Sequence, residues 1–215
     1  MRSFPSLLNS VVSKKFHYFK KSDDKSTVYF EESKNEIKER ATFQLFPQQI
    51  SETCFFEFDK DDSEIYPFFE TKAGLRVKND FILVHQKGNN IYIFLIELKS
   101  TNPTGYLTQL RAGRQFFQFI IDRIKLASAS ESKSWTDFDL KELEKFQFTY
   151  KGILFRKEDT ENITDSRKTI PKRKTSSKEE SRHTKLKKIP IDKNEDGFDI
   201  YHQYYNHEYY LSQFI

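Results

Sequence analysis

Apolar residues alternate with polar turns most clearly between positions 81 and 98. FILV at 81–84 is a short β-favouring run, QKGNN at 86–90 is typical of a turn, and IYIFLIEL at 91–98 is a longer apolar run. Two such runs around a Gly-Asn pair predict a β-hairpin. Because both faces of the two runs are apolar, we expect the hairpin to lie in the centre of a sheet.

The residues after the loop at 100–105 follow the helical period instead. Apolar residues and one glycine recur at three- and four-residue spacing, which predicts an amphipathic helix of about five turns. Its apolar stripe consists of Tyr106, Leu110, Gly113, Phe117, Ile120, Ile121 and Ile124. Further strands are expected at 54–59 and 146–155, where aromatic and β-branched residues gather.

The pattern is less regular elsewhere. The charged helix formers of EESKNEIKERATFQLF, residues 31–46, predict a helix of about two to three turns. Residues 65–77 are expected to be extended, with a turn near Gly74. Residues 1–22 predict a short peripheral helix. The order of elements predicts an α/β (α+β) domain in which helices flank a central mixed β-sheet.

Positive charge is concentrated in one segment near the C-terminal end of the chain. Residues 167–188 hold ten Lys/Arg against two Glu, a net charge of +8, and the rest of the chain is at −4. We therefore expect a core at 23–160 followed by a basic, flexible segment at 161–188. Such a segment suits a phosphate backbone, although a solvated linker has the same composition.

The Tyr-rich C-terminal segment, residues 189–215, holds too many aromatic residues to be left exposed. It could pack on the core as a helix, or it could form a contact with a partner protein or a second copy of the chain.

Composition also indicates the cellular environment of the protein and excludes some classes of site. A single cysteine, Cys54, excludes an internal disulfide framework and fits the reducing cytoplasm. No apolar run reaches the ~18–20 residues of a membrane span, so no membrane association is expected. The six glycines form neither a P-loop nor a dinucleotide-binding pattern.

Charged residues at the ends of the hairpin strands are the best candidates for chemistry. A two-residue loop at Gly88-Asn89 places Asp80 opposite Glu97, and a loop shifted by one residue places it opposite Lys99. Both registers put Asp80, Glu97 and Lys99 on one face of the sheet, whereas a three-residue loop would separate Asp80 from the other two.

Two carboxylates on adjacent strands suit a hard cation such as Mg²⁺ or Mn²⁺. The main-chain carbonyl of Leu98 is placed to join them, and Lys99 could orient or deprotonate a water molecule activated by the metal. Arg111 and Arg114, near the start of the following helix, are candidates for phosphate contacts.

These residues resemble the PD-(D/E)xK, or restriction-endonuclease-like, nuclease superfamily over about residues 30–155. The resemblance implies a core in the order α-β-β-β-α-β, with Asp80, Glu97 and Lys99 as the motif and Gln109 as the glutamine of the following helix. It also implies an acidic residue on the first helix, for which Glu36 is the candidate. Asn79 stands where the family motif has proline.

Three alternatives stay open. Glu-x-Lys occurs five times in the chain, and the copy at Glu70 is the main rival of the one at Glu97. The charged residues could form only a salt bridge, Glu97–Lys99 or Lys99–Asp80. The fold could then be a degenerate nuclease that binds nucleic acid or supports assembly without cleaving.

The favoured hypothesis is a Mg²⁺- or Mn²⁺-dependent nuclease that hydrolyses phosphodiester bonds. The resemblance implies a DNA endonuclease of a defence system, such as antiphage defence, or of a mobile element, with RNA as an open alternative. Besides Arg111 and Arg114, the residues expected to bind nucleic acid belong to the basic segment: Lys172, Arg173, Lys174, Lys185, Lys187 and Lys188.

Overall fold

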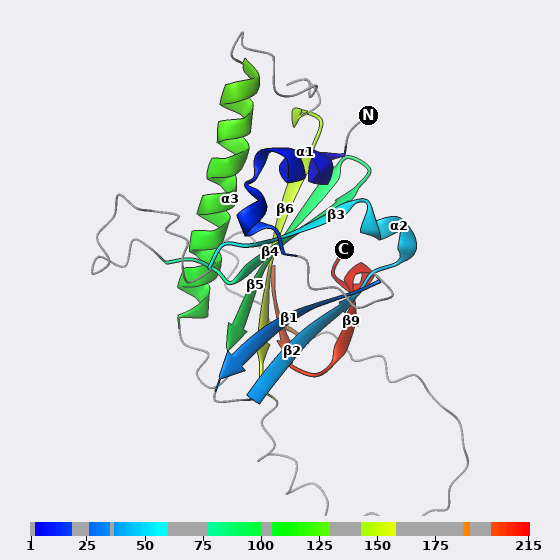
Figure 1. Cartoon of the computed structure of the whole chain (residues 1–215), viewed down its shortest axis with the longest axis vertical. Coiled ribbons are helices and arrows are strands. Elements are labelled where there is room, and N and C mark those ends of the chain that lie inside the picture. The colour runs from blue at the N-terminus through cyan, green and yellow to red at the C-terminus, as the bar shows by residue number, and fades with distance from the viewer. Residues whose placement is uncertain are drawn as a thin grey trace, which may run out of the picture.

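The computed structural model describes eight ranges of the chain (Figure 1), and the statements below concern them: 3–18, 26–34, 37–59, 77–99, 105–129, 143–157, 187–189 and 199–215. Within them the chain is a mixed α/β protein with two mixed β-sheets and few helices.

The larger sheet has six strands in the order β3-β4-β5-β6-β8-β7. The strands are β3 (Thr53–Glu57), β4 (Phe81–Lys87), β5 (Asn90–Lys99), β6 (Gln147–Arg156), β7 (Lys187–Ile189) and β8 (Asp199–Tyr204). β4 is antiparallel to both of its neighbours, β3 and β5, and β5, β6 and β8 are parallel. The carboxyl ends of these three parallel strands therefore meet at one edge of the sheet. The strands predicted at 54–59, 81–98 and 146–155 are confirmed.

The smaller sheet corrects one prediction. Within the segment 31–46, expected to be helical, residues 31–34 and 37–44 lie instead in two antiparallel strands, β1 (Thr27–Lys34) and β2 (Ile37–Gln44). Val28 and Phe30 alternate with less buried neighbours and are fully packed. This period-two burial overrides the helix propensity of the charged residues. The parallel strand β9 (Glu208–Tyr210) completes the sheet.

Two helices cover one face of the larger sheet: α1 (Phe4–Val11) and α3 (Tyr106–Ala129) (Figure 1). The apolar stripe predicted for α3 is confirmed, because Leu110, Phe117 and Ile121 lie in the core. Residues 1–22 were expected to be peripheral, but Phe4, Leu7 and Leu8 of α1 are completely or almost completely buried. The short elements η1 (Lys14–Phe16), α2 (Pro47–Ile50) and η5 (Leu211–Phe214) connect or end the larger ones.

The opposite face of the larger sheet packs against the smaller sheet through an aromatic core. The Tyr-rich C-terminal segment contributes β8, β9 and η5 to this arrangement rather than the helix considered from the sequence. Tyr201, Tyr205 and Tyr209 are buried in the aromatic core. None of the helices within the described ranges is long and apolar enough to cross a membrane.

Candidate active site

The β4–β5 hairpin fixes which residues face each other. Lys87 pairs with Asn90 and Phe81 pairs with Ile96, so the loop is the two-residue Gly88-Asn89 turn. Gly88 has a φ of 61°, as expected for the first central residue of a type II′ turn. Of the two registers considered from the sequence, the structure has the one that brings Asp80 opposite Glu97.

Asp80 continues the hairpin beyond the last paired residue of β4. Its Oδ2 accepts a hydrogen bond of 2.6 Å from the backbone N–H of Leu98. The N–H and C=O of a residue in an antiparallel ladder point to the same neighbouring strand. The carbonyl of Leu98 therefore also points toward the start of β4, beside Asp80.

Glu97, Lys99 and Gln109 form a connected polar chain. The Nζ of Lys99 lies 2.7 Å from Oε1 of Glu97 and donates a hydrogen bond of 2.6 Å to Oε1 of Gln109. The Glu97 side chain is completely buried and that of Lys99 is 20% exposed. Gln109 lies in the first turns of α3. The helix thus brings to the hairpin the residue that the superfamily resemblance implied.

The buried carboxyl group of Glu97 has a strongly shifted pKa. Burial and, second, the charge of Asp80 raise its pKa to about 8, while Lys99 and the main chain of Asp80 oppose the rise. Neither oxygen of Glu97 has a hydrogen bond of normal geometry among the described residues, although Oε1 is close to Lys99. Two carboxyl groups that repel each other in a buried site are an arrangement that a cation would stabilise.

A glycine and an asparagine hold α3 close to these residues. Asn79, which precedes Asp80, is 2% exposed, and its Nδ2 donates to the carbonyl of Phe81. A Cβ atom added to Gly113 would lie 2.6 Å from Cγ of Asn79. Only glycine allows this close approach of the helix, which brings Gln109 to the edge of the sheet.

The residues present fit a magnesium ion in ligand type. Mg²⁺ is usually bound by one or two carboxylates, with waters and substrate phosphate completing its octahedron. Asp80, Glu97 and the carbonyl of Leu98 supply such a set. No group of three or more His, Cys, Asp or Glu side chains gathers in the described ranges. Glu36, the candidate for a further acidic ligand, lies outside them, as does the rival motif at Glu70.

The predicted nucleic-acid-binding residues are only partly described. Arg111 and Arg114 lie on α3, and the guanidinium of Arg114 is 5.3 Å from the ring centroid of Tyr150. Lys187 and Lys188 belong to β7. The remaining basic residues lie outside the described ranges: Lys172, Arg173, Lys174 and Lys185.

Two residues near the site were missed by the sequence analysis. In the parallel register, Lys99 pairs with Arg156 of β6, and Glu97 is in line with Leu154 of β6 and His202 of β8. The ring of His202 is buried and lies edge-on to Tyr106 of α3, with centroids 5.6 Å apart. Arg156 follows an apolar strand run, the same signal that identified Glu97 and Lys99.

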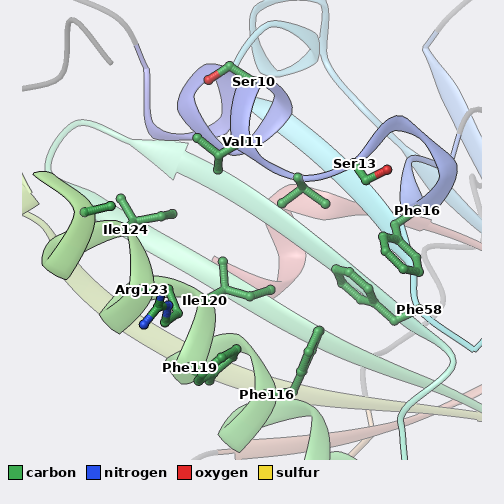
Figure 2. A pocket seen from close by; sticks show the side chains of 12 residues that line it. Ser10, Val11, Ser13, Phe16, Phe58, Phe116, Phe119, Ile120, Arg123 and Ile124 are labelled. Carbon is green, nitrogen blue, oxygen red and sulfur yellow. The ribbon is translucent and has the colours of Figure 1, made fainter. Parts of the chain in front are cut away.

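A cavity among the described residues lies away from the candidate site. It has a volume of about 540 Å³ and lies between α1, η1 and α3 (Figure 2). Its walls are mainly apolar, with Phe16, Phe58 and Phe116 among them and Arg123 at the side of α3 (Figure 2). None of the candidate site residues lines it.

Comparisons with protein-family models, with curated proteins and with solved structures found no match for this chain.

Proposed function

We propose that this chain is a metal-dependent nuclease with a restriction-endonuclease-like core, hydrolysing phosphodiester bonds in DNA. The observation that carries the proposal is the connected chain of Glu97, Lys99 and Gln109, with Asp80 opposite Glu97 and bonded to the backbone of Leu98. Order along the chain adds support, because α1, β3, β4, β5, α3 and β6 follow the α-β-β-β-α-β order of that superfamily, with the β1–β2 hairpin inserted.

Each residue has a role in this proposal. Asp80, Glu97 and the carbonyl of Leu98 would hold Mg²⁺ or Mn²⁺, which supplies positive charge to the phosphate and lowers the pKa of a water molecule. Lys99 has three N–H donors, of which one goes to Gln109 and another lies beside Glu97. The third can hold the attacking water, and Gln109 fixes the direction of the lysine side chain.

DNA is the proposed substrate because of charge and resemblance. The +8 segment at 167–188 can follow a phosphate backbone, with Arg111 and Arg114 as further contacts.

Attack by a water molecule on phosphorus forms one P–O bond and breaks another, so a strand is left with a phosphate at one new end and a hydroxyl at the other. A defence system or mobile element is the setting that the superfamily suggests, and action as a homodimer or with a partner protein belongs to the same proposal.

A second candidate is a nucleic-acid-binding module that does not cleave. One observation favours it: the ammonium group of Lys99 is already in contact with Glu97 and Gln109. A salt bridge with only a structural role would have the same geometry. The two candidates differ in what the loss of the lysine does, because only the nuclease needs Lys99 for its activity.

The deciding experiment incubates the full chain with plasmid, linear and single-stranded DNA and with RNA, in Mg²⁺, Mn²⁺ or EDTA. We expect metal-dependent cleavage of DNA that Asp80→Asn and Lys99→Ala reduce by about 10²-fold or more while the protein stays folded. Matched controls are Asp122→Asn on the exposed side of α3 and Lys87→Ala at the far end of the hairpin. Absence of cleavage of every substrate, with or without candidate partners, would reject the nuclease.

A further inference from the structure

The end of β6 carries a charged residue that the proposed mechanism does not use. Arg156 is the last residue of β6 and pairs in parallel register with Lys99 of β5 and with Tyr204 of β8. Neighbouring strands lie ~4.8 Å apart, and residues in register have side chains on the same face. Arg156 therefore projects beside Lys99 from the face that α3 covers, one strand farther from Asp80.

Arg156 has an unusual environment for an arginine. Its side chain is partly buried, and Nε has no hydrogen-bond partner among the described residues. The guanidinium carbon lies 5.6 Å from the ring centroid of Tyr204. In the described ranges no carboxylate forms an ion pair with it, whereas Arg40 bonds Glu31 at 2.8 Å. Burying a cation without an anion is costly unless a ligand supplies the anion.

The nearest carboxylate in the register is already engaged. Glu97 lies beside Lys99, and the strand position between Glu97 and His202 is the apolar Leu154. Among the described residues, the surroundings of Arg156 are thus an aromatic ring, a lysine and an apolar side chain. In open α/β sheets, ligands bind at the carboxyl end of parallel strands.

We propose that Arg156 binds a phosphate group of the nucleic acid next to the position held by Lys99. The planar guanidinium can donate two parallel hydrogen bonds to phosphate oxygens, and the ring of Tyr204 keeps its plane fixed. Lys99 would then face the phosphate at which the strand is cut. Arg156 would bind a neighbouring phosphate. This inference rests on the proposed function for the identity of the ligand, a nucleic-acid backbone.

The test measures binding of the full chain to a fluorescently labelled DNA strand in EDTA, over a series of salt concentrations. The variants are Arg156→Gln and Arg156→Lys, and the matched control is Arg123→Gln, an exposed arginine of α3 that lines the apolar cavity. Thermal unfolding of each variant is measured alongside. Arg156→Lys keeps a cation over Tyr204 and so remains informative if Arg156→Gln does not fold.

We expect Arg156→Gln to weaken binding about tenfold or more. The slope of log affinity against log salt should fall by about 0.7 to 0.9, the loss of one phosphate contact. Arg156→Lys should keep the slope but lose part of the affinity, because an ammonium cannot bond in parallel. Arg123→Gln should match the wild type. A structural role alone would change the unfolding temperature and leave the slope unaltered.

The outcomes separate this inference from the proposed nuclease. A folded Arg156 variant with unchanged affinity and slope overturns the phosphate contact, even where Mg²⁺-dependent cleavage is observed. An equal loss in Arg123→Gln overturns it too, because the effect would then be one of net charge. No DNA binding by the wild type also overturns it. A reduced slope without cleavage by any form supports the contact and rejects the nuclease.

Discussion

At the carboxyl ends of β5 and β6, the two faces of the larger sheet carry different kinds of residue. On one face, Leu98 and Phe155 are buried among the aromatic residues of the smaller sheet. On the other, the adjacent positions are Glu97, Lys99 and Arg156. Because the first face shows that apolar residues fit these strand ends, the fold itself does not require charged ones on the second. The charged face adds cost to folding, and the proposed binding and catalytic roles would account for that cost.

The largest effect is expected when a charge is removed from the charged face. Lys99→Ala should reduce the cleavage rate about 10²- to 10⁴-fold, because a group that handles the attacking water is lost. At pH 7 the free energy of unfolding should change little, because Glu97, whose pKa is about 8, is then mostly protonated and leaves no unpaired buried charge. Single-turnover cleavage and chemical denaturation measure the two quantities. A large loss of stability with unchanged cleavage would reverse the assignment of the two faces.

The aromatic face should respond in the opposite way. Phe155 is fully buried, with its ring edge-on to Phe43 at a centroid distance of 5.6 Å. Phe155→Ala should lower the free energy of unfolding by about 3–5 kcal/mol through the cavity it leaves. Cleavage per folded molecule should stay near the wild-type value. Phe155→Leu, which fills more of the space, should cost less, and denaturation curves of both variants provide the check.

The charged face should also make the stability of the protein depend on pH, through Glu97. The pKa of Glu97 rises from 4.5 to about 8 on folding, so the folded state binds more protons than the unfolded state between these values. This contribution to stability is therefore present below about pH 4.5 and is lost as the pH rises toward 8. Its size is on the order of a few kcal/mol.

Thermal unfolding across this pH range, with and without Mg²⁺, measures the effect. The cation competes with the proton on Glu97, so its stabilisation should grow as the pH rises. Glu97→Gln should remove both the pH-dependent contribution and most of the response to Mg²⁺. If that variant keeps the wild-type pH profile and metal response, Glu97 is neither the titrating group nor a ligand.

The smallest expected effect concerns the contact that brings α3 to the charged face. Gly113→Ala gains helix propensity but places a methyl group against the buried Asn79. Overpacking of this kind costs about 1–3 kcal/mol, more than the ~1 kcal/mol gained from propensity. Cleavage should fall as Gln109 moves away from Lys99. Gln115→Ala, at an exposed position of α3, is the control and should not destabilise the protein.

Local signals explain which elements could be predicted. The β4–β5 hairpin follows from a polar turn between two apolar runs, and α3 follows from its apolar stripe. Both depend on residues close together in the sequence. The β1–β2 hairpin was missed because its charged residues favour a helix in isolation, and only packing of Val28 and Phe30 against the larger sheet makes it extended. The C-terminal strands β8 and β9 were missed because their partners, β6 and β2, are distant in the sequence.

The candidate site also has features that follow from local sequence and features that depend on tertiary contacts. The sequence by itself determined that either two-residue turn puts Asp80, Glu97 and Lys99 on one face, because side chains alternate with period two along a strand. The structure selects the register in which Asp80 lies opposite Glu97. Only the tertiary structure decided that Arg156 lies beside Lys99 and that Gln109 reaches its ammonium group. The parallel pairing of β5 with β6 and the close packing of α3 at Gly113 join segments that no local pattern connects.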